Sequence, residues 1–401
     1  MNILLLALSI LLLLAGCASR PQSPVCNLYI QTEQDLPVSL TAKQKDSRVL
    51  QLEKAAALQA RSVSQLSRTI SNNFTQRQKV KSLSDASNYN ILALSAGGQY
   101  GAYGSGFLAA WDKDREIIAR SDIDMITGVS TGSMMATYAF LGSSSDPVVR
   151  KKYDDLLKKT YTNLHTENVC RQRDFLEMLF SNAACDSTPL HNLVNGIVTD
   201  ELLKEVIAEA DKSKRLLYVG AVNLDSGKFE FFDLISIAKD PSHDQRACYA
   251  AAILASAAIP VMFEPVFIND SMYNDGGIRR HTFFIEKAAE AAPVSGKKRL
   301  FGILHGELNV QPEKPDNHII DIAIRDVAIA ENQLFTDSAY YVDTVAAKKG
   351  YERHWTTAAR SGCPDPAEHK FDPALGTCLW NKGFNDASQP APWKALDELL
   401  R

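Results

Sequence analysis

The sequence has little net charge, which limits the partners that it can attract. Its 401 residues include 43 Lys and Arg against 47 Asp and Glu, a net charge of −4. Without a global positive field, the chain does not favour the phosphate backbone of DNA or RNA. We therefore expect no nucleic-acid partner.

Motifs for metal ions are also missing. The sequence has no Cys-x-x-Cys, no His-Glu-x-x-His and no tight cluster of His and Asp, which are the patterns that hold zinc. We therefore expect no metal and no cofactor. Disorder is excluded for most of the chain, because 45% of the residues are hydrophobic and 22% are charged, which is ordinary globular usage.

Long hydrophobic runs are scarce, and the most apolar one stands at the N-terminus. As a helix, residues 3–15 would span about 20 Å, too short for the ~30 Å core of a bilayer. The run is typical of a signal peptide, predicted over residues 1–16. It ends in Leu14-Ala15-Gly16-Cys17, which resembles the bacterial lipobox, where the bond before the cysteine is cut and the thiol carries lipid.

The lipobox resemblance predicts a lipid on Cys17 and therefore a protein anchored to a membrane of the bacterial cell envelope. Ala18, in place of Asp, favours the outer membrane. One departure from the signal pattern is that Met1-Asn2 supplies no Lys or Arg. An uncleaved N-terminal anchor remains the alternative.

The seven cysteines fit an exported, oxidising setting. Without Cys17, six remain, an even number that indicates disulfides and allows 15 connectivities. Two pairs are close in sequence within polar, turn-rich stretches, and they leave the third pair by elimination. The expected disulfides are Cys170–Cys185, Cys363–Cys378 and Cys26–Cys248.

Residues 17–88 are predicted to form a tether followed by a basic amphipathic helix. The stretch to about Asp46 is polar and contains three prolines, which favours an extended linker. Apolar residues then recur at steps of three and four from Val49 to Ile70. Residues 41–82 carry nine Lys and Arg against two acidic residues. This helix either packs on the domain with a solvated basic face or lies on anionic lipid.

The remainder alternates strand-like and helix-like stretches, which predicts an α/β fold. We expect three layers, with a mostly parallel central sheet and helices on both faces, and ligand sites at the carboxyl ends of the strands. The core is assigned to residues 89–310, with a cap-like insertion at 146–200. Residues 311–401 form a helical, cysteine-containing segment without a chemical motif. The expected strands are 91–95, 125–128, 216–222, 228–233, 266–268, 271–273 and 300–304.

Gly128-Val129-Ser130-Thr131-Gly132 lies between an expected strand and an expected helix. This is the context of the Gly-x-Ser-x-Gly nucleophile elbow, in which a sharp turn lifts the serine hydroxyl into the site. Side chains at Gly128 or Gly132 would collide with the neighbouring strand and helix. Ser130 is therefore the candidate nucleophile.

Two further glycine-containing segments complete the candidate site. Gly97 and Gly98 connect the first core strand to its helix, and their unobstructed amides suit an oxyanion hole. A plain tight turn is the alternative. Asp275 is followed by Gly276 and Gly277, a pattern that is usually only a turn.

The order of these elements resembles the patatin-like phospholipase family over roughly residues 90–304. The glycine-rich loop and Gly-x-Ser-x-Gly are followed by Ala255-Ser256-Ala257-Ala258-Ile259-Pro260 and then by Asp275-Gly276-Gly277. The resemblance implies a serine hydrolase of lipid esters. It also implies a catalytic dyad of Ser130 and Asp275, with Gly97 and Gly98 as the main oxyanion donors.

The chain departs from the family pattern at two places. Tyr100 stands where Arg or Lys is usual, after Ser95-Ala96 in place of Asp-Gly or Gly. Ile278-Arg279-Arg280-His281 lacks the usual Asn and Pro. None of these changes removes a reacting atom.

Two other functions remain open. One is an esterase, thioesterase or peptidase in which a histidine acts as the base for Ser130, with His305 as the strongest candidate. The other is a binding or scaffold lipoprotein that has kept the fold without the activity. The sequence identifies a lipid or acyl ester as the expected substrate and no particular protein partner.

Overall fold

The computed structural model describes most of the core and part of the N-terminal segment. The described residues are 20–28, 31–32, 66–81, 86–111, 117–174, 177, 181–286, 290, 294–310, 312–358, 362–364 and 371–399. The predicted signal peptide, Cys17 and residues 49–65 of the predicted helix lie outside them. Within the described residues, no helix is both long and apolar enough to cross a membrane.

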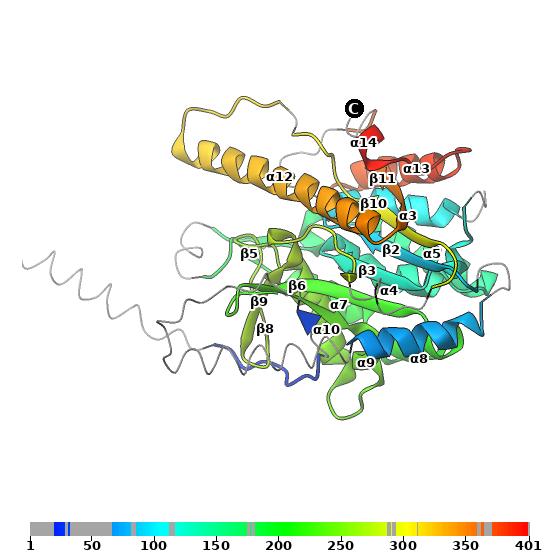
Figure 1. Ribbon diagram of the computed structural model, residues 1–401. Coiled ribbons are helices and arrows are strands. Elements are labelled where there is room, and N and C mark those ends of the chain that lie inside the picture. Colours follow the sequence, from blue (N-terminus) through cyan, green and yellow to red (C-terminus); the bar gives the residue numbers. More distant parts are fainter. Residues whose placement is uncertain are drawn as a thin grey trace, which may run out of the picture.

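A mixed β-sheet forms the centre of the molecule (Figure 1). Among the described strands its order is β1-β7-β6-β3-β2-β10-β11, and β9 pairs with both β6 and β8. The run β6-β3-β2-β10-β11 is parallel, whereas β1, β7, β8 and β9 are antiparallel to their neighbours. The strands are β1 (Gln31–Thr32), β2 (Tyr89–Leu94), β3 (Met125–Val129), β6 (Leu216–Asn223), β7 (Lys228–Asp233), β8 (Val266–Ile268), β9 (Ser271–Asp275), β10 (Lys298–Leu304) and β11 (Tyr351–Thr357).

The strands are buried on both faces, as expected for a sheet covered by helices. In β2, Leu92 and Leu94 join one hydrophobic core, whereas Ile91 and Ala93 join the other. This follows from the two-residue period of a strand, which sends successive side chains to opposite faces. The predicted three-layer α/β architecture is confirmed.

Helices cover each face of the sheet. One face packs against α3 (Gly101–Ala110), α4 (Thr131–Gly142), α5 (Pro147–Thr162), α7 (Thr188–Ile197), α8 (Asp200–Ser213), α9 (Leu234–Lys239), α10 (Gln245–Ala257) and α13 (Pro373–Ala387). The other packs against a helix at residues 66–78, α12 (Ile319–Lys348) and α14 (Leu396–Leu399).

The C-terminal segment, predicted to follow the core from residue 311, contributes a strand to the central sheet. Strand β11 extends the parallel sheet by pairing with β10. Helix α13 crosses α3 so closely that a Cβ at Gly383 would lie 2.0 Å from the carbonyl oxygen of Tyr103. A short strand with mixed polarity gives little signal in sequence, because its burial depends on neighbours elsewhere in the chain.

The described part of the predicted basic helix packs on the sheet. Leu66, Ile70 and Phe74 are buried at steps of four, the spacing of one helix face. Arg77 is buried as well, and its Nε donates a hydrogen bond of 2.9 Å to Asp124. Of the two roles left open by the sequence, the structure of residues 66–78 fits packing on the domain.

All three predicted disulfides are present: Cys26–Cys248, Cys170–Cys185 and Cys363–Cys378.

Residues 20–28 are fastened to the core, where the sequence predicts an extended tether. The amide of Cys26 donates to Oδ1 of Asn269, and Nδ2 of Asn269 donates to the carbonyl of Cys26, both at 2.7 Å. Arg20 pairs with Asp225. A polar, proline-containing composition predicts a linker, but it does not show the long-range bonds that order it.

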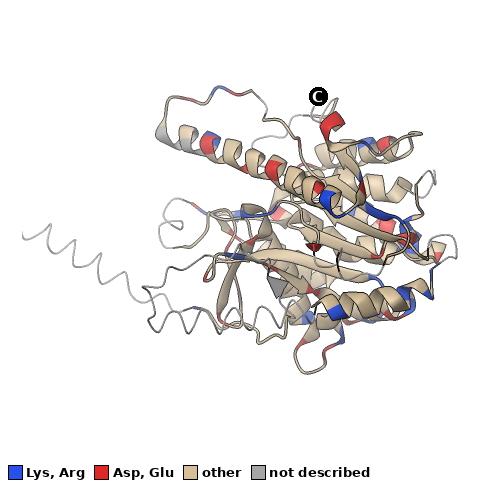
Figure 2. Ribbon diagram, in the orientation of Figure 1, with Lys and Arg blue, Asp and Glu red and all other residues tan. Residues whose placement is uncertain are grey.

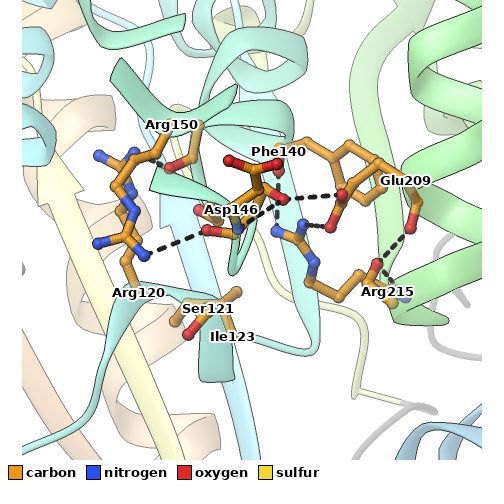
Figure 3. Close-up of polar contacts among 12 residues, drawn as sticks. Arg120, Ser121, Ile123, Phe140, Asp146, Arg150, Glu209 and Arg215 are labelled. Carbon is orange, nitrogen blue, oxygen red and sulfur yellow. Dashed lines mark hydrogen bonds and ion pairs between the residues drawn. The ribbon is translucent and has the colours of Figure 1, made fainter. Parts of the chain in front are cut away.

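Most charged side chains lie on helices and loops, whereas the central strands carry few (Figure 2). Two guanidinium groups, those of Arg120 and Arg215, are buried and take part in a cluster of polar contacts (Figure 3). Arg120 pairs with Asp154 at 2.8 Å and also donates to the carbonyl of Gly142 at the end of α4. Arg215 donates to the carbonyl of Phe140 at 2.8 Å and pairs with Glu209. The cluster thereby fixes the helix that follows Ser130.

Replacing Arg120 with alanine is expected to destabilise the protein by about 3 kcal/mol, because Asp154 would lose its partner and the helix carbonyls their donor. Thermal or denaturant unfolding measures this change. Lys151→Ala is the matched control, since the Lys151–Asp155 pair is exposed and such pairs contribute less than about 1 kcal/mol. Equal effects of the two substitutions would contradict a structural role for the buried cluster.

Candidate active site

Ser130 occupies a strained turn between β3 and α4. Its backbone has φ 53° and ψ −122°, a conformation that residues with a side chain rarely adopt. A Cβ at Gly128 would lie 2.4 Å from the carbonyl oxygen of Gly132, and one at Gly132 would lie 2.3 Å from that of Leu94. Both glycines are therefore required sterically, as the nucleophile-elbow interpretation predicts.

Side chains from other elements hold this turn. The amide of Ser130 donates to Oγ of Ser256 at 3.1 Å, and that hydroxyl donates to the carbonyl of Gly220 at 2.6 Å. Tyr161, from the predicted insertion, donates to the carbonyl of Thr131 at 2.8 Å. Ser256 and Tyr161 thus act as positioning residues for the turn.

The Gly97-Gly98 loop lies beside this turn with its amides unoccupied. Gly97 has φ 145° and Gly98 has φ 55°. A Cβ at Gly97 would lie 1.5 Å from the carbonyl oxygen of His305, so only glycine fits there. Within the described part of the chain, no group accepts a hydrogen bond from the amides of Gly97 and Gly98. These donors are available to a ligand.

Asp275 ends β9, next to β6. Its amide donates to the carbonyl of Ala258 at 2.9 Å, and its Oδ1 accepts the amide of Gly277 at 2.7 Å. The carboxyl is buried, with an exposed fraction of 3%. A Cβ at Gly276 would lie 2.6 Å from the carbonyl oxygen of Gly220, so this glycine allows the loop to approach β6 closely.

The environment of Asp275 disfavours its charged form. Burial raises the pKa of Asp275 to about 7, although the Ser130 hydroxyl and the Gly277 amide lower it, and the charge of Glu331 raises it further. Oδ2 has no hydrogen-bond partner within the described residues. The Ser130 hydroxyl is nevertheless close enough to lower the pKa of the carboxyl. A carboxyl with a pKa near 7 is well matched to general-base work near neutral pH.

One cavity of about 600 Å³ brings the candidate residues together. Gly97, Gly98, Ser130, Asp275 and Gly277 all line it. The strands β2 and β3 are parallel neighbours and end at the same edge of the sheet, whereas β9 runs antiparallel to β6 and places Asp275 opposite Ala221, next to the residue that pairs with the end of β3. The sequence prediction that these separated segments form one site is consistent with this geometry.

A comparison with protein families is consistent with this arrangement. Residues 92–286 match the family model of patatin-like phospholipases. This part of the chain is a patatin-like phospholipase domain. The crystal structure of VipD from Legionella pneumophila is similar at 12% identity and a TM-score of 0.34, covering 77% of this chain and 67% of that one. No curated protein matches the sequence.

A second, narrow cavity opens beside Ser130 in the patatin-like domain. Its volume is about 30 Å³, and Ser130 and Gly98 are among the residues that line it. The insertion predicted as a cap contributes Tyr161, Leu164 and Val169 to its walls. Most of the lining is apolar, which suits a small hydrocarbon group better than a polar one.

His305 supports the glycine loop. Its Nδ1 lies 2.6 Å from the carbonyl oxygen of Ser95, and its amide donates to Oγ of Ser95 at 2.7 Å. Its Nε2 packs against α3, where a Cβ at Gly104 would lie 2.2 Å away. Burial lowers the pKa of His305 to about 4. The ring of His305, the strongest histidine candidate, therefore contacts Ser95 and α3.

His281 is nearer to the acid. A Cβ at Gly277 would lie 3.4 Å from its Nδ1, which has no hydrogen-bond partner among the described residues. Burial lowers the pKa of His281 to about 4, and its ring packs edge-on against Phe335. It lines the large cavity beside Asp275.

Sequence reasoning missed two contributions to the site. The sequence places Ser256 in a family motif without a role. The structure shows that its hydroxyl bridges the Ser130 amide and the carbonyl of Gly220 in β6. Glu331, on α12, influences the pKa of Asp275 without any local sequence signal. Among the described residues, no group of three or more His, Cys, Asp and Glu side chains is placed to hold a metal ion.

Proposed function

We propose that the protein is a serine acyl hydrolase that cleaves carboxylic ester bonds of lipids through Ser130 and Asp275. The observation that carries the proposal is a single cavity lined both by Ser130, on a strained turn, and by the buried carboxyl of Asp275, whose pKa burial raises to about 7. Unoccupied amides at Gly97 and Gly98 line the same cavity.

The proposed reaction has two steps. Asp275 takes the proton of Ser130 as Oγ forms a bond to the ester carbonyl carbon, and the carbonyl oxygen becomes negative. The amides of Gly97 and Gly98 stabilise that charge. The C–O bond to the alcohol breaks, the alcohol leaves with the proton from Asp275, and an acyl-enzyme remains. Water then attacks the acyl group while Asp275 accepts its proton. The bond between the acyl carbon and Oγ of Ser130 breaks, Asp275 returns the proton to Oγ, and the acid is released.

The two cavities support an ester with an apolar acyl group. The narrow cavity beside Ser130 has an apolar lining and, at about 30 Å³, room for about one methylene group of that acyl part. The larger cavity has room for the alcohol part, and its wall includes polar side chains of α12 such as Asn332 and Arg325. A lipid satisfies both requirements.

The proposal is tested by labelling and by product analysis. A fluorophosphonate should label the wild-type protein and not Ser130→Ala, because the reagent reacts with an activated serine. Incubation with envelope lipid extract, followed by mass spectrometry, should show free fatty acid for the wild type alone. Absence of both label and product would favour the scaffold alternative.

Activity is expected to rise with pH about a midpoint near 7, because only the ionised Asp275 can accept the Ser130 proton. A histidine base would give a midpoint near 4, since burial lowers the pKa of His281 and His305 to about 4. The pH dependence of kcat/KM for a soluble short-chain ester distinguishes them. A profile that is already flat at pH 5 would rule out Asp275 as the base.

We also propose that the protein is held by lipid on Cys17 in the bacterial outer membrane. The support is the lipobox resemblance at Leu14-Ala15-Gly16-Cys17 together with the three disulfides, which are typical of exported proteins. Metabolic labelling with a fatty acid should mark the wild type and not Cys17→Ser.

A further inference from the structure

Large hydrophobic side chains are exposed around the active-site edge of the sheet. Among the described residues, six of them form a group that we call the apolar rim: Leu224, Val261, Ile322, Val327, Ile329 and Leu334. Val261 is the most exposed, at 80%, and the residues on either side of it line the large cavity. Exposed apolar groups gathered at a site opening mark an interaction surface.

Four members of the apolar rim lie on the first half of α12, which extends beyond the sheet (Figure 1). The helix has 30 residues and is therefore about 45 Å long, whereas β10 has 7 residues and spans about 23 Å. Only Lys349 and Gly350 separate α12 from the start of β11. The excess length therefore projects past the active-site edge, where Leu334 reaches the cavity.

The other two members lie on loops at the same edge. Leu224 follows the last residue of β6, and its amide donates to the carbonyl of Met272 in β9 at 2.8 Å. The carbonyl of Val261 accepts the amide of Ala184, next to β5 (Cys185–Asp186). In Figure 1, β5, β8, β9 and the free end of α12 appear on the same side of the molecule.

The N-terminal segment is fastened beside this rim. Arg20 pairs with Asp225, the neighbour of Leu224, and donates to the carbonyl of Asp270 at the tip of the β8–β9 hairpin. The Cys26–Cys248 disulfide secures the same segment covalently. Three residues of chain lead from Cys17 to Arg20, and they span at most about 11 Å. A lipid on Cys17 would therefore enter its membrane close to Leu224, at one end of the apolar rim.

We propose that the apolar rim rests on the surface of the bilayer that holds the Cys17 lipid, with the cavity mouth facing the membrane. This inference rests on the proposed lipid hydrolase and its anchor. The short, fastened connection restricts which face can turn toward the bilayer. A lipid can then pass from the bilayer into the cavity without exposing its chains to water, which is costly in proportion to the apolar area exposed.

The contact is apolar rather than electrostatic. Residues 319–334 carry Arg325 against three acidic residues, so this half of α12 has no excess of positive charge to attract anionic headgroups. Binding should therefore occur on neutral phosphatidylcholine vesicles and should persist in high salt.

The test uses residues 18–401, which include every described residue and lack the lipid. Val261→Asp combined with Val327→Asp is compared with the wild-type sequence by co-sedimentation with phosphatidylcholine vesicles. We expect the pair of substitutions to weaken binding at least tenfold and to lower hydrolysis of vesicle lipid by a similar factor. Hydrolysis of a soluble short-chain ester should stay within about twofold, because neither side chain lines the cavity.

Val80→Asp combined with Val148→Asp provides the matched control. Both valines are exposed, at 49% and 76%, but they lie at the opposite edge of the sheet. Val80 adjoins Lys81, which pairs with Asp124 just before β3, and Val148 follows the far end of α4. These substitutions should leave vesicle binding unchanged.

Three results would overturn the docking proposal. They are equal loss of binding in both double variants, binding only to anionic vesicles with loss in high salt, and self-association through the rim without vesicle binding. Failure of the hydrolase proposal is distinguishable, since the wild type would then cleave neither the soluble ester nor vesicle lipid, whatever its binding to vesicles.

Discussion

Replacement of Ser130 by alanine is expected to lower ester hydrolysis at least 10³-fold. The variant lacks the only atom that can form the proposed acyl-enzyme, and the unoccupied amides of Gly97 and Gly98 cannot replace a nucleophile. The fold should remain, because Oγ of Ser130 is not needed for the hydrogen bond from its own amide to Ser256. Initial rates with a soluble ester, together with thermal unfolding, measure both effects.

Two other serines provide comparisons for this variant. Ser143→Ala, at the far end of α4, should keep full activity, since Ser143 bonds only to its own helix at Ala139. Ser256→Ala should lose part of the activity, because it removes the bridge that positions Ser130. Residual hydrolysis by Ser130→Ala at the wild-type rate would refute the proposed mechanism.

Asp275→Asn is expected to abolish activity and, unusually, to stabilise the protein above neutral pH. Asparagine cannot accept the Ser130 proton, although it keeps an oxygen for the Gly277 amide. Because the folded-state pKa of Asp275 is raised from 3.8 to about 7, ionisation costs folding free energy. The cost begins as pH rises through 3.8 and is complete above about 7, where it approaches about 4 kcal/mol.

The pH dependence of this effect provides its own control. Below pH 3.8 the carboxyl is neutral in both the folded and the unfolded state, so Asp275→Asn should gain little stability there. Urea unfolding at an acidic and an alkaline pH gives the comparison. A stability gain that is largest in acid would contradict the raised pKa, whatever happens to the activity.

The local motifs could be predicted because their constraints are local. Gly128 and Gly132 flank Ser130 within one turn, and a Cβ at either position would collide with a backbone carbonyl oxygen. Seven of the nine described strands of the main sheet were also predicted, since continuous apolar runs such as Ile91 to Leu94 are typical of buried parallel strands. The disulfides followed from an even count of cysteines and two short separations.

Other features had no local signal. Strand β11 mixes exposed and buried residues, and only its pairing with β10 makes it part of the core. The first residues after Cys17 looked like a linker, yet Arg20 and Cys26 bind groups more than 200 positions away. Contacts of this range depend on how the whole chain folds, so composition cannot reveal them.

By itself, the sequence determined the α/β architecture, the turn that carries Ser130 and the candidate partner Asp275, since these depend on strand and helix periods and on glycine sterics. Only the tertiary structure decided the protonation chemistry and the surroundings of the site. Burial of Asp275 beside β6 raises its pKa, and the projection of α12 sets which face is apolar. Both depend on the exclusion of water by segments that are distant in the chain.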